Sequence, residues 1–287
     1  MTDQASRLRA MAQGQKSETA LFPSRVLAVT SGKGGVGKTN VVAGLAMSLA
    51  RVGQRVLVLD ADFGLANLDI LLGLTPTHTL EHVLRGEKLL EEIILDGPLG
   101  IKVIPASSGI QELTRLDTMA ELRLVQGLQR VSETQDWLLI DTAAGIHDSV
   151  IKLLMAAQEV LLVTTPEPTS LVDAYAMVKV IHLRDPKKPI WVLVNNAQMP
   201  SEAEETLEQL QAATLRFLGR ELNILGMIPS DPHILQAVRQ QRGVVELYPR
   251  SPSAQAFRLF ADQLKKKVPL QKDGFAAFWK QLSAEES

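Results

Sequence analysis

The stretch SGKGGVGKTN, residues 31–40, decides the fold, because four glycines and two lysines in ten positions suit no regular helix or strand. It follows the apolar run RVLAVT (25–30) and precedes a segment with helical spacing, residues 39–53. Glycine backbones let successive N–H groups point at phosphate oxygens, and the positive end of the following helix adds to the attraction. The pattern of glycine, four residues and Gly-Lys-Thr predicts a nucleotide site formed by Gly32, Lys33, Gly34, Gly35, Val36, Gly37, Lys38, Thr39 and Asn40.

Within this loop the two lysines have different expected tasks. Lys38 is expected to reach the β- and γ-phosphates, and the Thr39 hydroxyl to bind Mg²⁺. Lys33 lies near the start of the loop and need not contact the nucleotide of its own subunit. A cation at that point can reach phosphates held by a neighbouring subunit, as an arginine finger does. The alternative is a solvated surface lysine.

The rest of the chain alternates apolar runs with helical stretches from residue 25 to about residue 268. Runs whose centres are continuously apolar and that end in polar residues, such as RVLVLDAD (55–62) and EVLLVTTPEP (159–168), indicate strands buried on both faces. We therefore predict an α/β, doubly wound, mainly parallel sheet of seven or eight strands with helices on both faces, the architecture of a P-loop NTPase. The expected organisation is an N-terminal extension (1–24), this domain (25–268) and a C-terminal helix (269–287).

Composition narrows the class of protein. The net charge of −2 gives no general attraction to nucleic acid, so no specific nucleic-acid partner is expected. The chain has no cysteine, which excludes thiolate-bound zinc or iron–sulfur clusters and fits a reducing compartment. No apolar run approaches the roughly 18 residues of a membrane span, and the N-terminus lacks a signal-peptide core. A cytoplasmic protein is expected.

Polar residues follow the predicted strands, at the edge where doubly wound sheets bind ligands. Asp141 ends the run WLLI and is expected to hold Mg²⁺ through water. Asp60 either belongs to the metal shell or simply ends its strand. Gly145 is positioned to donate its backbone N–H to the γ-phosphate. We therefore predict a metal site made of Thr39, Asp60 and Asp141.

The motif KGGVGKT resembles the deviant Walker A motif of the MinD/ParA group of dimerising ATPases. The resemblance continues in VLVLDADFGLANLDILLG (56–73), LLIDTAAG (138–145), TTPEPTSLVDAY (164–175) and VNN (194–196), and covers about residues 25–265. It implies ATP and Mg²⁺ enclosed between two subunits of a homodimer, with Lys33 acting across the interface.

The same resemblance implies further roles. Asp62 would orient the attacking water, so the expected catalytic residues are Lys33, Lys38 and Asp62. Asn195 would hydrogen-bond the adenine edge, unless it only forms a turn, and Pro229 and Asp231 would line the base pocket. Glu167, between two prolines, would touch the ribose or the dimer partner, unless it only stiffens its loop.

The N-terminus MTDQASRLRAM is similar to the activator segment of the FlhG (FleN) family, MinD relatives that control flagellar number and placement. The resemblance implies binding and stimulation of the FlhF GTPase, a signal-recognition-type enzyme. A frayed tail is the alternative. The expected partner-binding residues are Asp3, Gln4, Ala5, Leu8 and Arg9.

The C-terminal sequence DGFAAFWKQLSAEES (273–287) places bulky apolar residues on one helix face with lysines nearby. This composition suits a helix in the interface of an anionic membrane, and MinD relatives carry such a helix. The alternative is a helix packed on its own core, and the two are compatible if ATP releases it. The expected membrane-binding residues are Phe275, Phe278, Trp279 and Leu282.

Together these features predict an ATP-dependent dimerising switch that regulates flagellum number or placement. Its expected partners are a second copy, the FlhF GTPase, an anionic membrane, and flagellar basal-body or transcriptional regulators. It would be cytoplasmic and reversibly peripheral at the inner face of the cell membrane. The alternative is a MinD/ParA-like positioning ATPase for the cell-division site or for DNA partition.

Overall fold

A computed structural model describes residues 25–62, 67–105 and 134–266, with a few single residues outside these ranges. Those single residues are Ala120, Arg123, Gln126, Gly127, Arg130, Val131 and Phe278. The predicted partner-binding residues Asp3, Gln4, Ala5, Leu8 and Arg9 lie outside the described residues, as do Phe275, Trp279 and Leu282.

Eight strands form one sheet in the order β3-β4-β2-β5-β1-β6-β7-β8. Every neighbouring pair is parallel except the short antiparallel pair of β3 with β4. The mainly parallel sheet predicted from the apolar runs is therefore confirmed. The strands are β1 Arg25–Thr30, β2 Val56–Ala61, β3 Leu95–Asp96, β4 Lys102–Ile104, β5 Trp137–Thr142, β6 Glu159–Thr164, β7 Ile190–Ala197 and β8 Asn223–Pro229.

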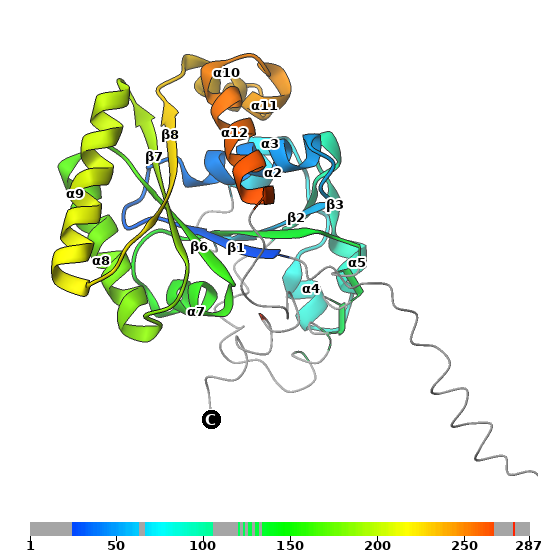
Figure 1. The fold of residues 1–287 in the computed structure, drawn as a ribbon. Coiled ribbons are helices and arrows are strands. Elements are labelled where there is room, and N and C mark those ends of the chain that lie inside the picture. The colour runs from blue at the N-terminus through cyan, green and yellow to red at the C-terminus, as the bar shows by residue number, and fades with distance from the viewer. Residues whose placement is uncertain are drawn as a thin grey trace, which may run out of the picture.

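Helices cover both faces of this sheet, as the doubly wound prediction requires. Figure 1 shows α2, α3 and α10–α12 above the sheet and α4, α5 and α7 below it. The helices are α2 Lys38–Arg51, α3 Leu68–Leu72, α4 Leu80–Leu84, α5 Leu90–Ile93, α7 Asp148–Ala156, α8 Pro168–Arg184, α9 Pro200–Leu218, α10 Pro232–Arg239, α11 Val244–Leu247 and α12 Pro252–Lys266, with a 3₁₀ turn η1 at Pro98–Gly100.

The central strands are buried at every position because each face has its own apolar layer. Along β1, Val26 and Ala28 join the lower cluster, whereas Leu27 and Val29 join the upper one. This alternation follows from the two-residue repeat of a strand. A strand in this position must be apolar throughout, which explains why the runs in the sequence show no polar alternation.

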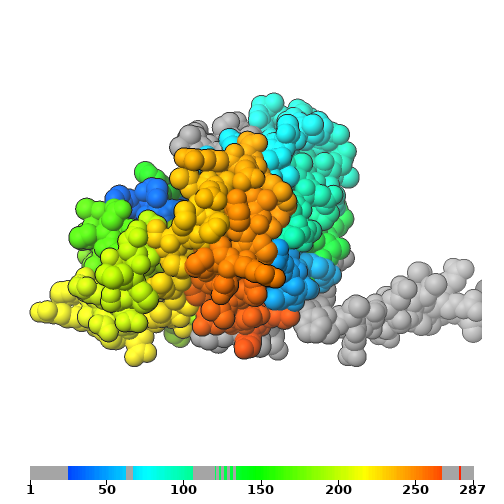
Figure 2. Space-filling model, turned by 90° about the horizontal axis from the view of Figure 1, so that it is seen from above, coloured from blue at the N-terminus to red at the C-terminus, as the bar shows by residue number. Residues whose placement is uncertain are grey.

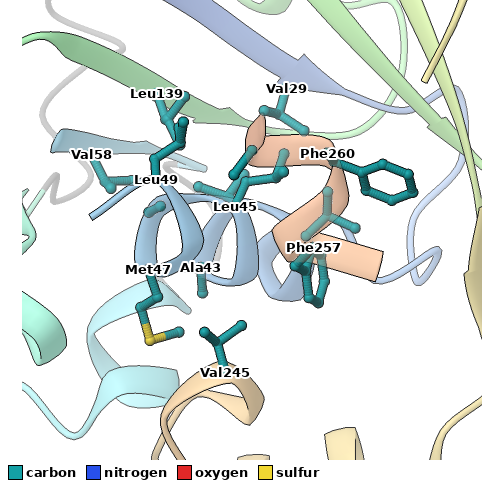
Figure 3. Close-up of a cluster of buried hydrophobic side chains, with 14 of the residues drawn as sticks. Val29, Ala43, Leu45, Met47, Leu49, Val58, Leu139, Val245, Phe257 and Phe260 are labelled. Atoms are coloured by element: carbon teal, nitrogen blue, oxygen red, sulfur yellow. The ribbon is translucent and has the colours of Figure 1, made fainter. Parts of the chain in front are cut away.

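In the upper layer α12 packs directly on α2, the helix that begins at the phosphate loop. A Cβ at Gly44 of α2 would lie within 2.5 Å of the Phe257 ring, so only glycine allows this close approach. Figure 3 shows Phe257 of α12 beside α2, with Val58 and Leu139 of the sheet toward the upper left of the same cluster. Burial of such large side chains stabilises the layer by roughly 1.5–3 kcal/mol each.

The C-terminal segment contributes one described residue, Phe278. Its side chain is fully buried in the lower cluster, which includes residues of α4, α7 and the sheet. In this conformation Phe278 is packed on its own core, and membrane contact by this ring requires it to leave that cluster. Within the described part of the chain, no helix is both long and apolar enough to cross a bilayer.

Candidate functional site

The phosphate loop joins β1 to α2 in a conformation that depends on glycine. Gly35 and Gly37 have φ angles of 79° and 83°, which other residues rarely adopt. Gly32 meets a different limit, because a Cβ there would lie 2.3 Å from the backbone oxygen of Asp173 on α8. The loop is therefore held close to the start of α8, with its amides at the N-terminus of α2.

A cavity of about 660 Å³ opens over this loop. Asp62 reaches the same cavity from the end of β2, although it is 22 or more residues from the loop in sequence. Of the predicted residues, the lining includes Gly34, Gly35, Val36, Gly37, Lys38, Thr39, Asn40 and Asp62. The remaining lining residues were not anticipated: Ser31, Asn67, Ile70, Leu71, Ala144 and Val238.

A buried ion pair lies beneath the loop. Lys38 Nζ donates to Asp141 Oδ1 at 2.5 Å, and the two side chains are 7% and 1% exposed. The other carboxylate oxygen, Oδ2, is buried with no hydrogen-bond partner among the described residues. Burial raises the pKa of Asp141, although Lys38 and Thr39 act against that rise.

This arrangement fits a magnesium ion. A buried carboxylate oxygen without a donor, close to a threonine hydroxyl, is an oxygen ligand set of the kind Mg²⁺ prefers. Thr39 and Asp141 would hold the ion, which would neutralise charge on nucleotide phosphates. Lys38, once it leaves Asp141, would supply a positive charge to the same phosphates.

Asp60 lies level with Asp141 on the neighbouring strand. Its carboxylate accepts hydrogen bonds from the backbone N–H of Asp62 at 3.1 Å and of Leu68 at 3.3 Å. Burial and the nearby Asp141 raise the pKa of Asp60 to about 7. Asp60 thus ties together the end of β2 and the start of α3, which positions Asp62 at the cavity, besides any part it has in a metal shell.

Lys33 makes its contacts within its own chain. Its Nζ donates to Glu167 Oε2 at 2.7 Å and to Thr169 Oγ1 at 3.2 Å, at the N-terminus of α8. Side-chain exposures of 40% for Lys33 and 62% for Glu167 leave this pair open to solvent. Reaching a neighbouring subunit therefore requires exchange of a surface contact, which is worth about 1 kcal/mol or less.

The backbone N–H of Gly145 also makes its hydrogen bond within the chain. This N–H, predicted to reach the γ-phosphate, donates to the carbonyl of Ser31 at 2.9 Å. Ser31 Oγ in turn donates to the carbonyl of Lys33 at 2.9 Å. Ser31, which no motif marks as functional, therefore joins the start of the phosphate loop to the loop that follows β5.

The three residues predicted to hold adenine are not in the cavity lining. Asn195 is buried, and its Nδ2 donates to the carbonyl of Val36 at 2.7 Å, so its amide contacts the phosphate loop. Asp231 accepts from the N–H of His233 at 3.0 Å and of Ser253 at 3.1 Å, which caps α10 and holds the start of α12. Burial acts to raise the pKa of Asp231, but these hydrogen bonds outweigh it and keep the pKa below its usual range. Pro229 ends β8 next to this cap.

The comparisons with known proteins match this fold and site. Residues 23–265 match the ParA family model described as "NUBPL iron-transfer P-loop NTPase", and the chain belongs to this ParA/MinD family of P-loop ATPases. The absence of cysteine leaves no thiolate to hold an iron–sulfur cluster, which sets this chain apart from the iron-transfer description.

Three relatives show how far the similarity extends. The antiactivator FleN of Pseudomonas aeruginosa is 45% identical over 249 residues, which is 87% of this chain and 89% of FleN. The flagellum site-determining protein YlxH of Helicobacter pylori is 33% identical and covers 98% of both chains. The septum site-determining protein MinD of Pyrococcus horikoshii, complexed with Mg-ADP, superposes with a TM-score of 0.69 at 27% identity, covering 85% of this chain and 96% of MinD.

Proposed function

We propose that this ATPase is a nucleotide-dependent switch that controls the number or placement of flagella. The observation that carries the proposal is the 45% identity to an antiactivator named FleN over 87% of the chain, together with similarity to a flagellum site-determining protein along 98% of the chain. Three septum site-determining proteins are 30–35% identical, which is lower than FleN and favours a flagellar role over a division-site role.

The proposed switch uses ATP and Mg²⁺ to join two copies of the chain. In the structure Lys33, Lys38 and the N–H of Gly145 each bond to a group of the same chain. ATP phosphates offer Lys33 and Lys38 an anionic acceptor in place of the carboxylates that they contact in the structure. They offer the Gly145 N–H an ionised acceptor in place of the neutral Ser31 carbonyl, and such hydrogen bonds are about twice as strong as neutral ones. In the proposed dimer Lys33 reaches the nucleotide of the second subunit. Asp62 orients the water that hydrolyses ATP, and hydrolysis allows the dimer to separate.

Both terminal segments are assigned to partners in this proposal. Residues 1–24 bind and stimulate the FlhF GTPase through Gln4 and its neighbours, and residues 269–287 bind an anionic membrane in the ATP dimer. Burial of Phe278 in the lower cluster supports a packed state from which ATP releases the segment. The proposal also includes transcriptional and basal-body partners, and the name antiactivator of the similar protein FleN supports the transcriptional one.

Gel filtration with ATP or ADP tests the switch. The wild type is expected to elute as a dimer with Mg-ATP and as a monomer with Mg-ADP, and Lys33→Ala to remain a monomer with both. A wild type that stays monomeric with ATP would contradict the proposed dimerising switch. A parallel assay measures FlhF GTP hydrolysis with and without the chain, with Gln4→Ala as the variant and Gln15→Ala as the control in the same segment.

A further inference from the structure

Helices α10–α12 concentrate positive charge on one part of the molecule. Residues 232–266 contain six arginines and lysines against two acidic residues, a formal charge of +4 in a chain whose net charge is −2. All six cations are exposed, whereas the acidic residues Glu246 and Asp262 are only partly exposed. We define the basic face as Arg239, Arg242, Arg250, Arg258, Lys265 and Lys266.

Little of this charge is neutralised locally. Within the described residues, the ion pair of Arg242 with Glu246 is the only one that involves the basic face. Arg258 donates to the backbone oxygen of Pro249 at 2.8 Å, and Lys265 to that of Val52 at 2.9 Å, which orients both side chains without removing their charge. A cluster of uncompensated cations attracts anionic surfaces.

Several of these cations lie on neighbouring parts of the fold. Arg258 and Lys265 are seven residues apart on α12 and so lie on the same side of it. The bond from Arg258 to Pro249 places the backbone next to Arg250 in the chain beside α12. Figure 2 shows the elements of this region, in orange, as one uninterrupted surface of the molecule.

Two exposed leucines lie on the helices that carry the basic face. Leu235 of α10 is 56% exposed and Leu259 of α12 is 64% exposed. Cations alone suit any polyanion, including a nucleic acid, which is contacted mainly through its phosphates. Cations mixed with exposed leucines suit a lipid surface, which offers anionic headgroups and an apolar layer beneath them.

The position of α12 in the chain also favours a lipid surface as the partner of the basic face. α12 ends at Lys266, and the next 21 residues include Lys267, Lys272 and the aromatic residues of the C-terminal segment. We propose that the basic face is a second membrane-contact surface, which lays the α10–α12 side of the ATPase domain against anionic headgroups when the C-terminal segment binds lipid. This inference rests on the membrane binding in the proposed function.

Vesicle sedimentation with Mg-ATP tests this surface. Vesicles contain either 30% phosphatidylserine or only zwitterionic lipid, and the full chain is compared with a triple variant, Arg250→Gln, Arg258→Gln and Lys266→Gln. The matched control removes three cations elsewhere, as Lys179→Gln, Lys187→Gln and Arg216→Gln, on the exposed surface of α8, its following loop and α9. Gel filtration confirms that both triples still form the ATP dimer.

The expected result is an affinity for anionic vesicles at least tenfold lower in the basic-face triple, a change below twofold in the control, and no difference on zwitterionic vesicles. Wild-type affinity at 50 mM salt should also fall more steeply with added salt than that of the triple. Equal binding by the wild type and the basic-face triple would contradict membrane contact by the basic face, but not membrane binding by the C-terminal segment. Failure of the wild type to bind any vesicle would overturn the membrane part of the proposed function as well. Retention of duplex DNA that the triple loses, with vesicle binding unchanged, would reassign the face to nucleic acid.

Discussion

The sheet has a buried ion pair at each of its two edges, and the surroundings of the pairs differ. At the carboxyl-terminal edge, Lys38 and Asp141 face a cavity, one carboxylate oxygen lacks a partner, and Asp60 adds a second buried acid nearby. At the amino-terminal edge, Glu159 accepts from Arg25 at 2.5 Å and from Trp191 Nε1 at 3.1 Å. Arg25 also bonds to the backbone oxygen of Leu264.

This difference indicates a ligand-binding site at the carboxyl-terminal edge and a purely structural set of contacts at the amino-terminal edge. At the amino-terminal edge the contacts join β1, β6, β7 and the end of α12, and the Arg25 guanidinium also lies 4.6 Å from the Trp137 ring centroid. At the carboxyl-terminal edge the contacts are replaceable, since a phosphate and a metal ion can take the places of Asp141 and Lys38 as partners. Four experiments test this comparison.

The largest effect is expected for Asp62→Ala at the carboxyl-terminal edge. Among the described residues, the Asp62 carboxylate accepts no hydrogen bond, so its loss should hardly change stability. Loss of a group that orients the attacking water typically lowers turnover by about 10²–10⁴-fold. Phosphate release should fall by that factor, and the ATP dimer should persist in gel filtration.

Asp69→Ala is the control, because it removes a neighbouring carboxylate on α3. Its turnover should stay within twofold of the wild type. Unchanged hydrolysis in Asp62→Ala would show that Asp62 does not orient the attacking water.

The second effect concerns the amino-terminal edge and stability. Arg25→Met leaves the buried Glu159 without its charged partner, which typically costs about 3–5 kcal/mol. Urea unfolding should show this loss, whereas ATP affinity of the folded protein should stay within twofold.

The double variant Arg25→Met with Glu159→Gln should recover part of the loss, since the amide removes the unpaired charge and can still accept from Trp191. An ATP affinity that falls in parallel with stability would contradict the separation of the two edges.

The sequence allowed much of the carboxyl-terminal edge to be predicted and little of the amino-terminal one. Glycine spacing and strand-end acids are local patterns, so the loop, Asp62 and Asp141 could be assigned to one site before the structure was known. The pairing of Arg25 with Glu159 joins residues 134 positions apart, and no local pattern marks it.

Other contacts escaped prediction for the same reason. The hydrogen bond from Asn195 to Val36 and the cap formed by Asp231 depend on how separate loops pack, although each residue lies at a strand end as expected. The two-residue strand β3 is too short to show any periodicity. Burial of Phe278 in the lower cluster could be stated only as an alternative, because an apolar helix face looks the same whether a membrane or a core covers it.

The third effect is a pH dependence from Asp60. The pKa of this carboxyl is about 7 in the folded protein, against 3.8 as its ordinary value. Between about pH 4 and pH 7 the folded state keeps a proton that the unfolded chain has released, so this group makes stability fall as pH rises. Above pH 7 the cost reaches about 4 kcal/mol at most, from 1.36 kcal/mol per pKa unit.

Asp60→Asn should therefore raise stability in metal-free buffer at pH 8 by a few kcal/mol and change it little at pH 4. Asp231→Asn should behave in the opposite way, because its pKa is lowered: the stability that Asp231 contributes is present above about pH 4 and is lost as pH falls. Urea unfolding at pH 4, 6 and 8 compares the two. An Asp60→Asn profile parallel to the wild type would show that folding does not shift the pKa of Asp60.

The smallest effect is expected at the surface contact between Lys33 and Glu167. Because this pair is partly exposed, its loss should lower the free energy of unfolding by about 1 kcal/mol or less, so the melting temperature should hardly change. The same loss should free the Lys33 side chain. Glu167→Gln should then strengthen ATP-dependent dimerisation by up to about fivefold, measured by analytical ultracentrifugation, since Lys33 no longer has to leave a carboxylate before it reaches the second subunit. The prediction that Glu167 contacts the ribose requires the opposite result, a loss of ATP affinity in the monomer. Thr169→Val, which removes only the 3.2 Å hydroxyl contact, separates the two: it should strengthen the dimer slightly if the α8 terminus restrains Lys33, and have no effect if Glu167 acts on the nucleotide.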